Sequence, residues 1–156
     1  MSERGEHLET VFGGPSDDAF GSAVFRRALP GDAALEPLAR EIYRDFVGEL
    51  WDRLGADAWL APWSLAAARA QGSAQSVVDL LDTLEDPATR SAADMLVNAN
   101  PDPEAARDAL REAFDHDGIS ELKVFTIGDG EAMSGLLIAA QDRETSEAIV
   151  LVFLMD

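Results

Sequence analysis

Cysteine is absent from the sequence, and histidine occurs only at positions 7 and 116. Without cysteine the chain has no disulfide, no thiolate nucleophile, no Cys-ligated zinc and no iron–sulfur cluster held by cysteine. Neither histidine lies at the spacing from an acid or a hydroxyl that marks a zinc peptidase or a serine hydrolase. We therefore expect no cofactor, and no motif assigns a catalytic or metal-binding residue.

Long apolar runs are also missing. No stretch approaches the roughly 18 apolar residues of a membrane-spanning helix. Residues 1–9 carry acids where a secretion signal has an apolar segment. These features predict a cytoplasmic protein that does not bind a membrane.

Basic residues are scarce compared with acidic ones. The sequence has 30 Asp and Glu against 12 Lys and Arg, a formal net charge of −18, and Lys123 is its single lysine. Such a charge repels nucleic acid and steers basic partners toward the surface. A high-salt cytoplasm or a biased composition also produces this excess, so the charge by itself leaves both explanations open.

The length of 156 residues and the 47% hydrophobic content fit one folded domain. Residues 1–15 end in two glycines and a proline, and we expect them to be a loose N-terminal leader. Residues 16–156 are then a single globular α+β domain.

Most of that domain shows helical periodicity. About five to six helices are expected from the three- and four-residue spacing of apolar side chains and from terminal signals such as Asp-Pro starts and Gly stops. They cover residues 16–28, 32–54, 57–71, 73–84, 87–99 and 103–118.

The C-terminal part changes to short branched and aromatic runs separated by polar turns. Runs at 122–127, 135–140 and 148–155 predict a three-stranded antiparallel meander after the helices. A helix over 131–143 is the competing interpretation, and the meander is favoured because Gly135 lies inside that segment. An uncovered C-terminal edge strand at 149–155 would favour a homodimer.

Two short segments resemble ligand loops but fail on spacing. The glycines at 128, 130 and 135 follow a strand, yet the third comes too late for a dinucleotide loop and no lysine follows for a phosphate loop. A hairpin is the better interpretation, with Ser134 the first nucleophile candidate if one exists. In the segment 115–118, an EF-hand alignment puts Ala113 and Val124 at ligand positions, so a helix end with solvated acids is expected.

Acidic side chains repeat at three- or four-residue spacing on two predicted helices. These are candidate partner-binding residues: Glu41, Asp45, Glu49 and Asp52 on one helix, and Glu104, Asp108 and Glu112 on the other. Solvated helix faces are the alternative.

Three tryptophans, Trp51, Trp59 and Trp63, are close enough in sequence to line an apolar pocket or to pack as core.

The preferred hypothesis is an acidic interaction domain that covers a basic partner surface, in the manner of an inhibitor, immunity protein or chaperone. The alternative is a small-molecule-binding domain or enzyme with a pocket between helices and sheet, using Asp57 or Glu131 as a carboxylate of raised pKa.

Overall fold

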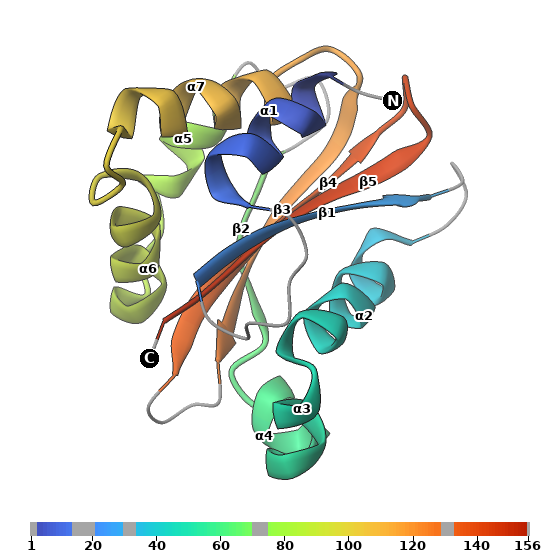
Figure 1. Ribbon diagram of the computed structural model, residues 1–156, viewed down its shortest axis with the longest axis vertical. Helices are drawn as coiled ribbons and strands as arrows, with labels where there is room; N and C mark the ends of the chain where they lie inside the picture. Colours follow the sequence, from blue (N-terminus) through green and yellow to red (C-terminus); the bar gives the residue numbers. More distant parts are fainter. Residues whose placement is uncertain (1–2, 14–20, 30–33, 70–74, 129–132, 156) are drawn as a thin grey trace.

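The computed structural model describes residues 3–13, 21–29, 34–69, 75–128 and 133–155. Within these ranges the chain forms seven helices and a five-stranded antiparallel sheet with strand order β1-β5-β4-β3-β2 (Figure 1). The strands are β1 (Gly21–Ala28), β2 (Ser64–Arg69), β3 (Ile119–Gly128), β4 (Ser134–Asp142) and β5 (Glu147–Met155). The helices are α1 (Glu3–Phe12), α2 (Leu35–Val47), α3 (Glu49–Leu54), α4 (Ala56–Leu60), α5 (Val77–Leu81), α6 (Pro87–Val97) and α7 (Pro103–Phe114).

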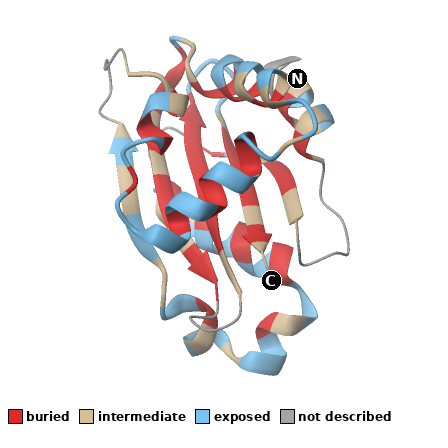
Figure 2. Ribbon diagram, turned by 90° about the vertical axis from the view of Figure 1, so that its left-hand side faces the viewer, coloured by how far each residue is buried: buried red, intermediate tan, exposed pale blue. Residues whose placement is uncertain are grey.

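Helices cover both faces of the sheet. Successive strand residues point to opposite faces, so Ile138 and Leu151 pack under α1, α5, α6 and α7, while Leu137 and Val150 pack against α2, α3 and α4. Figure 2 shows the resulting burial of the sheet between outer layers with exposed helix surfaces. The central strands β4 and β5, which are covered on both faces, are therefore nearly continuous apolar sequences.

The C-terminal meander and two helix starts are confirmed. Strands β3, β4 and β5 pair consecutively and antiparallel, so the helix considered for 131–143 is wrong over the strand Ser134–Asp142. Asp86 and Asp102 cap α6 and α7 by accepting hydrogen bonds from backbone N–H groups, each with a proline at the start of the helix. The sheet is larger than expected, since β1 and β2 flank the meander.

The helix predicted over 16–28 is wrong in its described part. Gly21–Ala28 is a strand that pairs with β5, and residues 16–20 lie outside the described ranges. Val24 faces one core and Phe25 the other. Long-range pairing thus outweighs a helical spacing that three apolar residues satisfy by chance.

The loose leader expected at 1–15 is replaced over residues 3–12 by helix α1. Leu8 and Phe12 are buried against the sheet and α7. Beyond the helix, the Gly13 carbonyl accepts a 2.8 Å hydrogen bond from the Val24 N–H on the outer side of β1. The chain before β1 therefore covers part of that edge.

Two other predicted helices are interrupted. The helix over 32–54 breaks at Gly48, whose φ of 66° lies in a region that glycine adopts easily and other residues rarely do. Its second part ends before Gly55, as predicted. The segment 57–71 is helical only to Leu60 and becomes β2 after Pro62, which lacks the N–H that a helix needs. In the segment 73–84, helix α5 is limited to Val77–Leu81.

The C-terminal strand is not an edge strand. β5 lies between β1 and β4 and pairs along its length with both. The homodimer predicted through residues 149–155 therefore has no free backbone edge to use. The edges of the sheet are β1 and β2.

Candidate functional site

An open groove of about 740 Å³ lies between β2 and the α5–α6 turn. Its floor contains the small side chains of Ala66 and Ala67 and the apolar Leu80, and its rim carries the exposed acids Glu85 and Asp86. The remaining lining residues are Pro62, Ser64, Leu65, Ala68, Gln75, Thr83 and Thr126. The groove is open to solvent and its lining mixes apolar, hydroxyl and carboxylate side chains.

Strand β2 presents an unpaired backbone edge beside this groove. It pairs with β3 on one side, and no backbone hydrogen bond from another part of the described chain reaches Ser64–Arg69 on the other. The register shifts between Leu65 and Ala67, as at a β-bulge. Leu65 is 54% exposed, an unusual position for a large apolar side chain next to an open edge.

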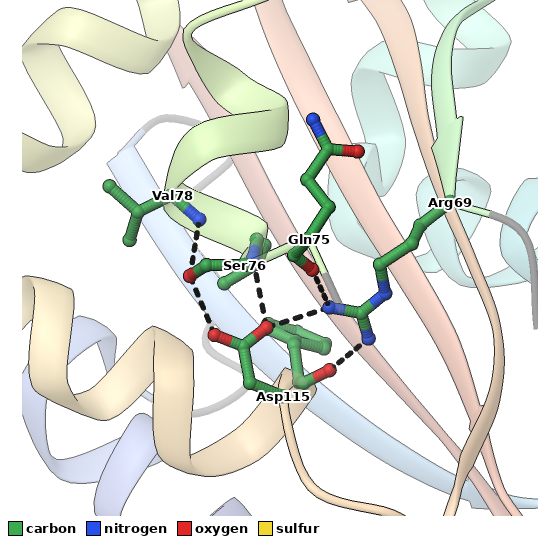
Figure 3. Close-up of polar contacts among 7 residues, drawn as sticks. Arg69, Gln75, Ser76, Val78 and Asp115 are labelled. Atoms are coloured by element: carbon green, nitrogen blue, oxygen red, sulfur yellow. Dashed lines mark hydrogen bonds and ion pairs between the residues drawn. The ribbon is translucent and has the colours of Figure 1, made fainter. Parts of the chain in front are cut away.

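A buried ion pair fixes the end of β2 (Figure 3). Arg69, whose side chain is 8% exposed, donates through Nη1 to Asp115 Oδ1 at 2.7 Å and to the Gln75 carbonyl at 2.9 Å. Its Nη2 donates to the Phe114 carbonyl at the end of α7. A guanidinium is favourable there, because the C-terminus of a helix carries partial negative charge.

Asp115 extends the same network to α5. Its Oδ1 also accepts the Val77 N–H at 2.8 Å, and its Oδ2 accepts the Ser76 hydroxyl at 2.7 Å. Ser76 in turn caps α5 by accepting the Val78 N–H at 3.3 Å. This set of contacts, which we call the Arg69–Asp115 clamp, joins β2, α5 and α7 and so holds both walls of the groove. The expectation of a solvated Asp115 is wrong for this reason.

The rim acid Asp86 is held in its ionised form. Its Oδ2 accepts the Thr89 N–H at 2.9 Å and the Thr89 hydroxyl at 2.8 Å, and the Thr89 hydroxyl contacts that of Thr126 at 2.7 Å. The backbone hydrogen bond from Thr89, followed by the side-chain one, lowers the pKa of Asp86 below 3.8. Hydrogen bonds to a carboxylate favour its charged form.

The seven predicted partner-binding acids are exposed but lie in two separate groups. Glu41 and Asp45 share Arg27, with contacts of 3.9 and 2.6 Å, and Glu49 and Asp52 continue beyond Gly48 on α3. On α7, Asp108 pairs with Arg111 and Glu112 with His7, while Glu104 has no ion pair in the described part of the chain. Helices α2 and α7 cover opposite faces of the sheet (Figure 1).

The three tryptophans form an aromatic cluster with Tyr43 and Phe125. Trp63 stacks on Phe125 with ring centroids 4.6 Å apart, and Trp51 stacks on Trp59 at 6.5 Å. Trp51 and Trp59 are buried, and Trp59 Nε1 donates to the Leu50 carbonyl. They pack on the face opposite α5 and do not line the groove. Asp57 is exposed on α4, and Glu131 lies outside the described residues.

His116, Asp142 and Glu144 form a second polar cluster, with ligand atoms within 4.8 Å of one another. His116 Nε2 lies 3.3 Å from Asp142 Oδ2 in a fully buried carboxylate, and Nδ1 accepts the Gly118 N–H at 3.1 Å. Because Nδ1 accepts a hydrogen bond, the proton of the neutral ring is on Nε2, facing Asp142. Nε2 and Asp142 Oδ2 face each other without a hydrogen bond, so the cluster is a close histidine–carboxyl contact.

The glycine-rich segment lies between β3 and β4, which pair as an antiparallel hairpin in which Ser134 is the partner of Gly128. Gly128 has φ of 131°, and a Cβ there would lie 2.3 Å from the Met133 carbonyl oxygen. Residues 129–132 are outside the described ranges. The pairing of β3 with β4 confirms the hairpin that was the alternative to a nucleotide-binding loop.

The comparisons with protein-family models, with curated proteins and with solved structures find no match to this chain. Across the described residues, no helix combines the length and the apolar character required to cross a membrane.

Sequence reasoning missed the groove and its clamp. Arg69 and Asp115 are 46 positions apart, and neither belongs to a motif. The available signal was Ser76 before an apolar run, which marks a helix start, but nothing in the sequence indicates which strand lies beside that helix.

Proposed function

We propose that this chain is a protein-interaction domain whose acidic surface binds a basic partner, as an inhibitor, an immunity protein or a chaperone does. The observation that supports the proposal is the distribution of ion pairs. Several basic side chains already have carboxylate partners within the chain, as Arg26 has Glu9, Arg40 has Glu36 and Lys123 has Glu121.

Many exposed acids have no such partner in the described part of the chain. They are Glu6, Glu49, Asp52, Asp57, Asp79, Asp82, Glu85, Asp94, Asp102, Glu104 and Asp117. The excess of negative charge is therefore presented to solvent on several elements. A partner that brings lysine and arginine to this surface gains electrostatic attraction and a faster encounter.

The experiment uses the two acidic helix regions as matched probes. One variant carries E41Q, D45N, E49Q and D52N on α2 and α3, and the other carries D102N, E104Q, D108N and E112Q at α7. Each removes four charges by the same amide replacements. Immobilised wild type and both variants are exposed to extract of the source cells, and the affinity of the purified captured protein is then measured at several salt concentrations.

A partner docked on one face should lose about tenfold in affinity with one variant and less than about twofold with the other. Its binding should also weaken as salt rises. Binding that does not weaken with salt, or no partner for folded protein at low salt, would contradict the proposal, whereas losses below about twofold with both variants would place the docking surface away from these two helix regions, as at the β2 groove.

A small-molecule-binding domain or enzyme is the second candidate, and the volume of the β2 groove favours it. At about 740 Å³ the groove falls in the range of ligand pockets, roughly 300–1,000 Å³. A thermal-shift screen of metabolites tests it. A compound that raises the melting temperature of wild type, and not of a variant with Leu65 and Ala67 replaced by glutamate, would favour this candidate.

A further inference from the structure

We propose that the groove beside β2 binds an extended, lysine- or arginine-bearing segment of a protein partner, which adds a sixth strand to the sheet through the free edge of β2. This inference rests on the proposed function and specifies its site and the conformation of its partner.

The backbone of β2 provides the first part of the recognition. An open edge strand offers N–H and C=O groups to an incoming strand, and strand addition is a common way to bind extended peptides. At the other edge of the sheet, the Val24 N–H of β1 already donates a hydrogen bond to the Gly13 carbonyl. Among the described strands, β2 is therefore the edge strand whose outer side receives no backbone hydrogen bond from the described chain.

Side chains around β2 leave room for the added strand. Ala66, Ala67 and Ala68 project little, and the exposed Leu65 offers an apolar contact. The Arg69–Asp115 clamp holds β2 and α5 in place before the segment arrives. A preformed site binds with less loss of conformational freedom than one that must order on binding.

Charge identifies the class of segment. Glu85 and Asp86 line the groove without an ion pair in the described part of the chain. A basic side chain on the added strand meets these carboxylates. A second copy of this chain is disfavoured as the occupant, because pairing β2 with β2 would bring two sets of the same acids together.

The test uses a peptide of about ten residues in which threonine and lysine alternate, since this sequence is soluble, basic and prone to extended structure. A second peptide has the same sequence with an N-methyl group on every backbone amide, which removes strand pairing along both of its edges and keeps the charge. A third has glutamate in place of lysine. Binding is followed by amide chemical shifts of the labelled full-length protein at low salt.

Two protein variants locate the contact. E85Q/D86N removes two rim charges, and the asparagine that it introduces is still a good helix cap. E49Q/D52N makes the same chemical changes on α3, across the sheet, where both acids also lack an ion pair in the described part of the chain. The rim variant should bind the threonine–lysine peptide about three- to tenfold more weakly than wild type, and the α3 variant within about 1.5-fold.

The inference is supported if the largest shifts fall on Ser64–Ala68, if N-methylation abolishes binding, and if the rim variant alone is weakened. Equal binding of the N-methylated peptide, or equal weakening by both variants, means diffuse attraction and overturns the groove site while leaving the proposed function intact. Failure of the peptide to bind overturns the groove site too, and the capture experiment above then decides the proposed function by itself.

Discussion

Asp142 has a fully buried carboxyl group that faces the imidazole of His116. Glu144 donates its backbone N–H to Asp142 Oδ1 at 2.9 Å, but Asp142 Oδ2 has no hydrogen bond and lies 3.3 Å from the imidazole. A buried carboxylate that loses its partner is costly, since water cannot replace the lost contact. This residue pair is therefore a sensitive point for stability.

We expect His116→Ala to lower the free energy of unfolding by about 2–4 kcal/mol, because it removes the imidazole that faces the buried Asp142 side chain and the acceptor of the Gly118 N–H. Adding Asp142→Asn to that variant should restore part of the loss, since the buried group becomes neutral. Urea unfolding of the two single variants and the double variant measures the coupling. Strictly additive losses would show that the two side chains do not interact.

Asp86 gives a pH dependence whose sign follows from its lowered pKa. Because the pKa lies below 3.8 in the folded protein, the ionised form favours folding. This contribution is present above the unfolded value and disappears as the pH falls through the lower folded one. Asp86→Asn keeps the cap and cannot titrate, so its stability should fall less steeply than that of wild type between about pH 5 and pH 2.5. The free energy of unfolding of both proteins is measured with urea at several pH values. An equal loss of stability with falling pH in wild type and variant would refute this expectation.

At the scale of secondary-structure elements, the Arg69–Asp115 clamp joins three segments that are distant in sequence. Arg69→Met keeps the apolar stem and removes the guanidinium donors, so we expect a loss of about 3–5 kcal/mol in unfolding free energy. Hydrogen exchange should accelerate most in β2 and at the start of α5. Arg69→Lys is the control and should retain part of the stability, since it keeps the charge but not the planar geometry. Unchanged exchange in β2 would show that the clamp does not hold the strand.

The elements that could be predicted are those whose signals are local. Asp86 with Pro87 and Asp102 with Pro103 mark the starts of α6 and α7, because cap and proline effects act within one turn. The meander follows from short runs of branched residues. The local spacing predicts helix at β1 and β2, whereas their strand structure depends on pairing with β5 and β3, which lie far along the chain.

The candidate site was least predictable for the same reason. Acid spacing on α2 and α7 correctly identified exposed residues, but it could not reveal that the two helices lie on opposite faces. The groove depends on an edge strand and on the clamp between Arg69 and Asp115, which sequence periodicity does not encode.

At the scale of the whole molecule, a net charge of −18 opposes compactness through self-repulsion. Apolar cores on both faces of the sheet counter it. We expect the protein to be folded at about 20 mM NaCl and its melting temperature to rise by several degrees toward about 500 mM, where repulsion is screened. Circular dichroism at several salt concentrations measures this. Unfolding below molar salt would instead indicate a protein adapted to a halophilic cytoplasm.

The exposed acids beside β2 also bear on colloidal behaviour. Edge strands promote aggregation unless charge keeps their neighbours apart, and here the protection consists of carboxylates such as Glu85 and Asp86. Near the isoelectric point, about 4.2, carboxylates begin to protonate and net repulsion vanishes. Acidification that leaves the fold intact therefore weakens the repulsion between molecules while β2 keeps its open edge, and acidic storage or an acidic compartment is where this chain becomes vulnerable to sheet-to-sheet assembly.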